Sequence, residues 1–363
     1  MNFDSIITIA AFGVYLIFMI CIGMYFMGKS RTTTDYFLGG RKLGSWVTSM
    51  RAQASDMSGG LLMGLPGAAY LSGISAGWIA IGLAVGTYLN WLLVAKPLRQ
   101  YTKVANDAIT LPQFFKNRFQ DESGMISVIA AVFILVFFLF YTASGFVSCA
   151  KLFSSVFGIP YLGSRLVGAV VVISYPFAGG FFAVCWTDFF QGLLMFFCVI
   201  AVPSIAIGSL GGPSDFLAQV EAFNPNFLNM FVDGETNTPY TVLGIVSLLA
   251  WGLGYFGQPH ILVRFMGISS PSAIKKSRRI ASIWVLISLT AAVLIGVSGR
   301  MLLGDGLLVT AGNEETIYIN MVSRIFPVFI AGIFLSAILA AIMSTADIKL
   351  LVTSSAITDV FYH

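Results

Sequence analysis

Runs of about 20 apolar residues recur along the whole chain, and each is long enough to cross a bilayer core as a helix. Hydrophobic residues make up 57% of the 363 residues, and charged residues only 10%. Soluble domains carry about 25% charged residues, so a soluble globular domain is excluded. The sequence predicts an all-α polytopic membrane protein whose single transmembrane domain spans residues 1–363.

The first apolar run, residues 5–27, is too long for a signal-peptide core and has no small-residue cleavage site. We interpret it as a retained, peripheral first helix. About nine spanning segments are expected in all, at residues 5–27, 43–70, 77–95, 125–156, 162–182, 187–207, 241–265, 280–303 and 326–356.

Charged residues in the connecting loops predict the orientation of the chain. Lys and Arg gather at Lys29, Arg31, Arg41 and Lys42 and within residues 96–118 and 275–279, whereas residues 209–240 carry acids alone. Because Lys and Arg collect in cytoplasmic loops, the N-terminus is expected outside and the C-terminus in the cytoplasm. The expected location is the inner or plasma membrane, with the lipid bilayer and not nucleic acid as partner.

Two segments are interrupted by Gly and Pro, in the stretches SDMSGGLLMGLPG (55–67) and WGLGYFGQPH (251–260). Such breaks free backbone carbonyls, which membranes tolerate only where protein or a water-filled cavity satisfies them. Breaks in corresponding places of two halves indicate the binding site of a transporter. Close packing of helices through small residues is the alternative.

Other kinds of site have little support in the sequence. The His content is limited to His260 and His363, which leaves little for a zinc or haem site, so no cofactor is expected. No nucleophile–base pair or phosphate loop is evident, so an enzyme is not expected. No CxxC spacing occurs, and reduced, buried thiols are expected at Cys21, Cys149, Cys185 and Cys198.

Several motifs resemble the sodium/solute symporter family, most closely its sodium/proline symporter branch. They are ASDMSGGLLMGLPGAAYLSGI, FLFYTASG, GGFFAVCWTDFFQ, WGLGYFGQPHILVRFM and AGIFLSAILAAIMST. The resemblance implies a broken-helix fold of five plus five helices in an inverted repeat, with residues 43–207 as the first repeat and 241–356 as part of the second. Related chains continue for roughly four more helices, so this chain is expected to be truncated after about nine.

The resemblance also implies the site residues. Sodium is the implied coupling ion, with Asp56 as the essential acid beside it and Asp188 as a second acid near the cytoplasmic exit. Oxygens for sodium would come from Ala54, Met57, Ala341, Ser344 and Thr345. A proline pocket would be built from Ser58, Gly59, Tyr141, Trp251, Tyr255 and Pro259.

Some of these residues also have a plain structural interpretation. The aromatic rings could be packing residues, and the hydroxyls of Ser344 and Thr345 could satisfy carbonyls of their own helix. His260 could be a structural hydrogen-bonding residue or a proton relay.

Some residues depart from the family pattern: Arg51, Gln53, Gly60, Asp347 and Lys349. A charge near the bilayer centre costs about 2.5–3.5 kcal/mol, so we expect Arg51 to pair with Asp347 or Asp56. Three hypotheses follow: Arg51 or Lys349 substitutes for sodium, the charged pair locks a cytoplasmic gate, or Lys349 points to the inner interface.

The resemblance implies secondary active transport of a small amino acid, with proline as the first candidate, by sodium symport. Two alternatives remain open from the residues. One is a sodium-independent transporter in which Arg51 or Lys349 replaces the ion. The other is a membrane module that binds or senses the solute without moving it.

Overall fold

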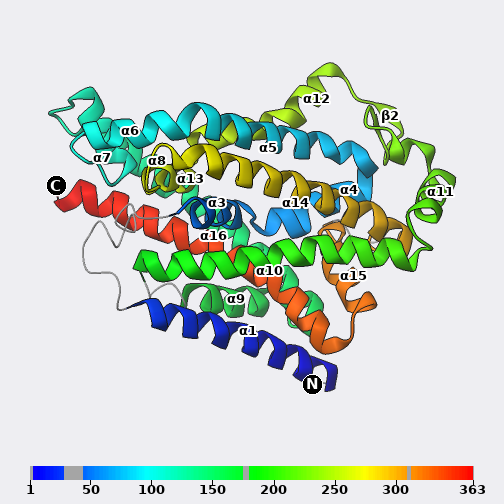
Figure 1. Cartoon of the computed structure of the whole chain (residues 1–363). Helices are drawn as coiled ribbons and strands as arrows, with labels where there is room; N and C mark the ends of the chain where they lie inside the picture. Colours follow the sequence, from blue (N-terminus) through cyan, green and yellow to red (C-terminus); the bar gives the residue numbers. More distant parts are fainter. Residues whose placement is uncertain (1–2, 28–43, 175–179, 309–311, 363) are drawn as a thin grey trace.

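The structure is a computed structural model that describes residues 3–27, 44–174, 180–308 and 312–362 (Figure 1). The basic residues predicted at positions 29, 31, 41 and 42 lie outside these ranges. Five helices are long: α1 (Phe3–Met27), α8 (Met125–Phe157), α10 (Gly180–Ser209), α14 (Ala273–Leu303) and α16 (Val328–Tyr362).

Shorter elements connect these long helices. Those before α10 are α3 (Ser45–Asp56), η2 (Gly60–Gly64), α4 (Leu65–Ser72), η3 (Gly73–Ala76), α5 (Gly77–Leu89), η4 (Asn90–Val94), α6 (Ala95–Val104), α7 (Leu111–Phe119) and α9 (Tyr161–Ser174). Those after α10 are α11 (Pro213–Phe223), η6 (Pro225–Leu228), β1 (Val232–Asp233), β2 (Thr238–Pro239), α12 (Val242–Leu249), η7 (Ala250–Gly257), α13 (Pro259–Met266), η8 (Glu314–Thr316) and α15 (Ile317–Ile325).

Six helical stretches in the described residues are long and apolar enough to cross a membrane, or seven if the bent pair α12–η7 and α13 is counted as one span. This differs from the nine expected segments in two places. The stretch Gly60–Val104 is continuous in helical residues, although it contains two of the expected segments. The expected segment 162–182 yields α9, which is too short to span, and part of it lies outside the described residues.

The chain reverses within Gly60–Val104, where Gly73 ends α4 with a φ of 75°. Tyr70 of α4 donates a hydrogen bond to the carbonyl of Gly304, just past the end of α14. By contrast, Arg278 near the start of α14 lies 5.2 Å from the ring centroid of Tyr88, near the end of α5. Helices α4 and α5 are therefore antiparallel, so this stretch contains parts of two segments that run in opposite directions (Figure 1).

The two broken segments run in opposite directions. Gly82 of α5 lies against Leu249 and Gly86 lies against Gly252, so α12 and η7 run parallel to α5 and thus antiparallel to α3 and α4. A side chain at position 86 would collide with the backbone of Gly252. Glycine at this position therefore allows α5 and η7 to pack closely. Opposed directions are what an inverted repeat requires, and the repeat bounds 43–207 and 241–356 stay a prediction.

Helix α16 is the most buried of the apolar helices. In its most apolar 18-residue window 78% of the residues are buried, against 33% for α1 and 22% for α8. Helix α16 packs on α1, α8 and α10, while α8 exposes a row of large apolar side chains that includes Phe133, Phe137 and Phe140. Exposed apolar residues at this density fit contact with lipid. Figure 1 shows α1 at the edge of the bundle.

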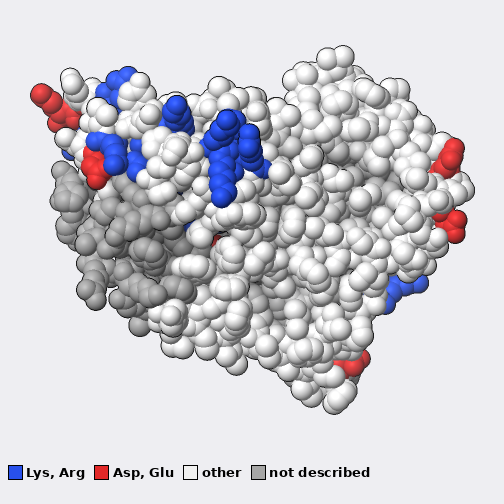
Figure 2. Space-filling model, in the orientation of Figure 1, with Lys and Arg blue, Asp and Glu red and all other residues white. Residues whose placement is uncertain are grey.

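The two ends of the bundle differ in charge. The N-terminal and C-terminal ends of the chain lie at opposite ends of the molecule (Figure 1). Figure 2 shows Lys and Arg gathered toward the end that carries α6 and α7, with some acidic side chains among them, whereas acidic and few basic side chains are visible at the other end. The basic residues at this end belong to α6, α7 and the first turns of α14.

Candidate functional site

The first broken helix stops at Asp56. Met57 leaves the helix with a ψ of 74°, and the next helical turns, η2, are a π-helix. The N–H of Gly60 donates to Ser58 Oγ at 3.2 Å, so the Ser58 side chain satisfies one backbone group that the break releases. Short π-helical stretches inside α-helices occur frequently at functional sites.

The second break lies between η7 and α13. Eight residues of η7 form a 3₁₀-helix, Gln258 is extended with a ψ of 108°, and Pro259 opens α13. Runs of 3₁₀-helix longer than four residues are uncommon, and here the helices on the two sides differ in direction by 46°. Asn90 donates to the Tyr255 carbonyl at 2.9 Å, which satisfies a backbone group in this segment.

A cavity of about 350 Å³ lies between the two breaks. Four of the six predicted proline-pocket residues line it, namely Ser58, Tyr141, Trp251 and Tyr255. Gly59 and Pro259 follow lining residues directly in the chain. A Cβ at Gly59 would come within 2.6 Å of Ser148 Oγ, so glycine here permits close contact with α8. Because 65% of Trp251 is exposed, this ring forms the rim of the cavity and does not enclose its interior.

Asp56 is the charged residue among the described residues of the cavity wall. It is half-buried, and its Oδ2 accepts a hydrogen bond from the Tyr255 hydroxyl at 2.6 Å. The two residues belong to different breaks, so this bond connects α3 to η7 across the cavity. The arrangement offers a carboxylate, two phenol hydroxyls and amide groups to a small zwitterion.

Four of the five predicted sodium-binding residues meet where α16 crosses α3. Ser344 Oγ donates to the Ala54 carbonyl at 3.0 Å, and Thr345 Oγ1 donates to the Ala341 carbonyl at 2.7 Å. The fifth, Met57, adjoins Asp56, and its Sδ accepts from Trp284 Nε1 at 3.2 Å. Carbonyl and hydroxyl oxygens at an unwound helix suit sodium. The hydroxyls also bond to their own helix, so the structural interpretation of Ser344 and Thr345 holds as well.

Asp188 lies in a second charged group, whose members are not among the residues that line the cavity. Its Oδ2 is 3.2 Å from Arg51 Nε and 3.3 Å from Arg264 Nη2, and all three side chains are fully buried. Arg264 also donates to the backbone carbonyl of Arg51. We predicted Asp347 or Asp56 as the partner of Arg51, and that prediction missed Asp188.

Close contact between α10 and α3 explains why Asp188 reaches Arg51. A Cβ at Gly192 would come within 2.9 Å of the Ala54 Cβ, so only a residue without a side chain fits there. Asp188 precedes Gly192 by one turn, as Arg51 precedes Ala54, and both turns lie on the facing sides of the two helices. Glycine at position 192 was the signal for this contact.

Lys349 and Asp347 are both buried on α16. Lys349 is 3% exposed and Asp347 is 1% exposed. The Lys349 ammonium lies 2.9 Å from the ring centroid of Tyr141, a cavity residue. The hypothesis that Lys349 points to the inner interface is therefore wrong.

Sequence reasoning missed three residues of the region. Arg264 binds Asp188, Gln258 lines the cavity, and Trp284 holds Met57 at the first break. A charged residue inside the apolar motif QPHILVRFM was the available signal for Arg264, because intramembrane charges mark functional sites. His260 is buried beside Phe138 and Tyr141, at ring-centroid distances of 5.7 and 6.1 Å.

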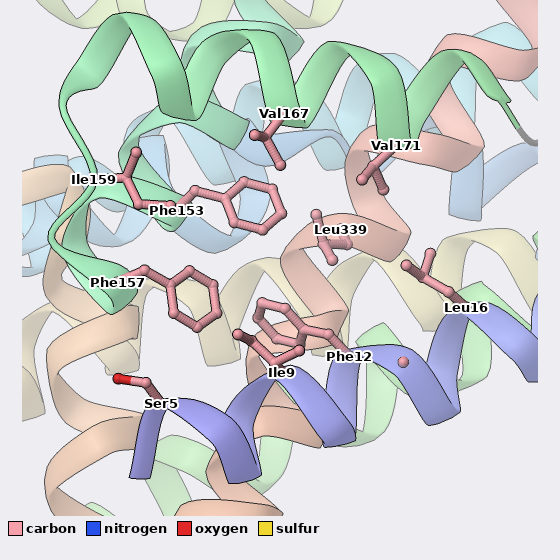
Figure 3. A pocket seen from close by; sticks show the side chains of 11 residues that line it. Ser5, Ile9, Phe12, Leu16, Phe153, Phe157, Ile159, Val167, Val171 and Leu339 are labelled. Atoms are coloured by element: carbon pink, nitrogen blue, oxygen red, sulfur yellow. The ribbon is translucent and has the colours of Figure 1, made fainter. Parts of the chain in front are cut away.

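A larger cavity of about 580 Å³ lies between α1, α8, α9 and α16. Figure 3 shows apolar side chains such as Phe12, Phe153, Phe157 and Leu339 around it. Among the described residues that line it, Ser5 is the one with a hydroxyl group. Such a lining cannot pair the charges of an amino acid, so we place the candidate site in the smaller cavity.

Cysteines and metals do not add a second chemistry in the described residues. No group of three or more His, Cys, Asp or Glu residues that could hold a metal ion occurs in the described part of the chain. Cys149 and Cys198 are buried free thiols, and Cys21 is an exposed one, contrary to the expected burial. The side chain of Cys185 lies outside the described residues.

The family of this chain follows from a comparison of its sequence with known proteins. A model of the sodium:solute symporter family matches residues 36–363. The chain belongs to this family. It is therefore a multi-pass membrane transporter and not an enzyme, and it belongs to a family of sodium-coupled symporters.

Three relatives are similar over almost the whole chain. The sodium/proline symporter of Haemophilus influenzae is 46% identical over 99% of this chain and 71% of its own length. Sodium/proline symporter 2 of Staphylococcus saprophyticus is 46% identical over 96% of this chain and 67% of its own length. The sodium/proline symporter of Staphylococcus aureus is 45% identical over 99% of this chain and 69% of its own length.

A solved structure shows the same fold. It is the substrate-bound outward-open state of a Na+-coupled sialic acid symporter, with a TM-score of 0.79 and 20% sequence identity. It covers 98% of this chain, which in turn covers 75% of that protein. The family member described here thus shares the broken-helix transporter fold.

Proposed function

We propose that this chain transports a small amino acid, proline by preference, together with sodium. The observation that carries the proposal is the cavity between the two helix breaks, where Asp56 and Tyr255 face a site next to the Ala54 and Ser344 oxygens. The names of the relatives at 45–46% identity support proline as the substrate.

The cavity suits a zwitterion with a small apolar body. The polar side chains of Ser58 and Gln258 on the cavity wall would receive the carboxylate. Asp56 or the Tyr141 and Tyr255 hydroxyls would receive the amine. Leu61, Leu65 and the aromatic rings would cover the pyrrolidine ring.

Sodium would bind where Ala54, Ala341, Ser344 and Thr345 meet, with Met57 as a further carbonyl donor. The donor set fits, because a hard cation prefers carbonyl and hydroxyl oxygens. In the chain, Asp56 stands between Ala54 and Met57, and it also lines the cavity. Its carboxylate would couple the ion to the substrate through charge.

The test is proline uptake into vesicles that contain the purified chain, with an inward sodium gradient and with choline in its place. Faster uptake with the gradient supports the proposal. Proline binding without uptake would favour the binding or sensing module, and uptake of a different amino acid under competition would correct the substrate.

We also propose that the basic end of the bundle faces the cytoplasm of a cell whose inner or plasma membrane holds the chain. The gathering of Lys and Arg toward the end with α6 and α7 supports it (Figure 2). Labelling single cysteines at position 217 in α11 and position 103 in α6 of intact cells tests it. A membrane-impermeant reagent should modify the first and not the second, and the reverse result would contradict the orientation.

A further inference from the structure

Gln53 departs from the family pattern, and the proposed function gives it no role. It belongs to α3, the helix that stops at Asp56, and it precedes Asp56 by three residues. Residues three apart lie on the same face of a helix. Both side chains line the cavity of about 350 Å³ between the two breaks. Gln53 therefore places an amide beside the carboxylate that the substrate amine would meet.

The Gln53 side chain is buried, with 3% exposed. Among the described residues, none donates a hydrogen bond to Gln53 Oε1. Buried side-chain oxygens in folded proteins are nearly always hydrogen-bonded, because an acceptor that is left unpaired destabilises the fold. An unpaired acceptor on the wall of a cavity therefore marks a position where a ligand that fills the cavity donates a hydrogen bond.

A second amide on the cavity wall, that of Gln258, differs in its surroundings. Gln258 Oε1 also accepts no hydrogen bond from the described residues, but Gln258 belongs to the second break and is only partly buried. Its N–H groups have the carboxylate of the proposed substrate as their partner. Of the two amides, Gln53 shares its helix face with Asp56, so it is the amide at the amine end of the substrate.

The wall of the cavity also separates Gln53 from the proposed sodium site. An amide oxygen can bind either a hard cation or an N–H group. Ala54 and Ser344, whose oxygens would hold sodium, are not among the described residues that line the cavity, whereas Gln53 is. The cation that the cavity brings to Gln53 Oε1 is consequently the amine of the substrate.

Resting on the proposed function, we propose that Gln53 is a specificity-determining residue whose amide oxygen accepts a hydrogen bond from the charged amine of the substrate. The charged proline nitrogen carries two N–H groups. Asp56 receives one of them and Gln53 receives the other. The site then discriminates against N-methylproline, which has a single N–H group and cannot supply both hydrogen bonds.

The experiment measures how proline and N-methylproline compete with radiolabelled proline for the purified full chain in sodium. N-methylproline keeps the ring and the carboxylate and lacks one N–H group. Gln53→Met removes the acceptor and keeps the length of the side chain, and Gln53→Leu replaces it if Gln53→Met does not fold. Gln258→Met is the matched control at the second break. Gln219→Met is the control outside the cavity, because Gln219 of α11 donates to the Leu210 carbonyl at 2.8 Å.

In the unmodified chain we expect N-methylproline to bind at least about tenfold more weakly than proline, because a hydrogen bond from a charged amine is lost. In Gln53→Met the two ligands should differ by less than about threefold, and proline itself should bind about tenfold more weakly. Gln258→Met should weaken both ligands by the same factor. Gln219→Met should leave both affinities unchanged.

Three results would overturn the inference. The first is that Gln53→Met keeps the preference for proline over N-methylproline. The second is that this preference is lost in Gln258→Met instead. The third is that Gln53→Met changes only the difference between binding in sodium and binding in choline, which would assign the amide oxygen to the ion.

Thermal unfolding of the substrate-free chain separates this inference from the proposed function. An acceptor without an internal partner has no hydrogen bond to lose, so Gln53→Met should unfold at the same temperature as the unmodified chain or at a higher one. A lower unfolding temperature would mean that Gln53 bonds within the fold, and it would overturn the inference. If no form binds proline, the substrate proposal fails, and the unfolding temperature still decides whether Gln53 is kept for a ligand.

Discussion

Asp56 and Asp188 are two acids in the interior of one transporter, and their surroundings differ. Asp188 is fully buried, and two arginines from α3 and α13 contact its Oδ2 at 3.2 and 3.3 Å. Asp56 is half-buried on a cavity wall and accepts one hydrogen bond, from Tyr255 at 2.6 Å. The charge of Asp188 is therefore balanced by the fold itself, whereas that of Asp56 is accessible to whatever enters the cavity.

This difference indicates different roles. A buried ion cluster holds three helices together, and removing one member leaves the others without compensation. An acid on a cavity wall contributes less to stability and more to binding. The comparison can be tested one side chain at a time.

The largest effect on stability is expected from Asp188→Asn. Two buried guanidinium groups would lose their shared carboxylate, and breaking such a pair costs about 3–5 kcal/mol in the free energy of unfolding. Denaturant or thermal unfolding of the purified chain measures it. Glu221→Gln, at an exposed position of α11, is the control and should change little. An equally small loss for Asp188→Asn would mean that this cluster does not hold the fold.

For Asp56→Asn we expect a large effect on proline affinity and a small effect on the stability of the fold. Proline affinity in sodium should fall by about tenfold or more, which is about 1.4 kcal/mol. Unfolding should change much less than in Asp188→Asn, because Asp56 is half-buried and, among the described residues, Asp188 and not Asp56 forms buried ion pairs with arginines. Equilibrium binding and thermal unfolding of the same preparation measure both quantities. A loss of stability that matches Asp188→Asn would remove the distinction between the two acids.

Local chemistry made part of this arrangement predictable from the sequence. Gly and Pro around Ser58 and Gln258 mark the two breaks, and the three-residue and four-residue spacings of Ala341, Ser344 and Thr345 place them on one helix face. Family resemblance then assigned the cavity residues. Each of these inferences rests on neighbours along one helix or on a motif.

Contacts between helices distant in the sequence were harder to predict. The partner of Arg51 depends on how closely Gly192 lets α10 approach α3, which no spacing along α3 or α16 reveals. The place of Lys349 depends on a choice between an interface and the face of Tyr141. The number of spans depended on the reversal at Gly73, inside a continuous run of helical residues.

Tyr255→Phe tests the surroundings of Asp56, and its effect on proline affinity should be smaller than that of Asp56→Asn. It removes the hydroxyl that donates to Asp56 and keeps the ring, so about 1 kcal/mol, or roughly fivefold in proline affinity, should be lost. Tyr240→Phe is the matched control, since Tyr240 donates to Asp233 at 3.5 Å in the segment that carries β1 and β2. Unchanged proline affinity in Tyr255→Phe would show that Asp56 does not need this donor to bind the substrate.

Glu315→Gln should have the smallest effect of the four. Lys151 and Glu315 form an ion pair whose side chains are 23% and 42% exposed, so water screens their attraction. Exposed pairs contribute about 0–1 kcal/mol, and the Lys151 ammonium keeps its 3.1 Å bond to the Gly312 carbonyl. Unfolding and proline binding should therefore both stay near those of the unmodified chain. A loss comparable to Asp188→Asn would mean that burial does not separate these ion pairs, and the contrast between Asp56 and Asp188 would then need another cause.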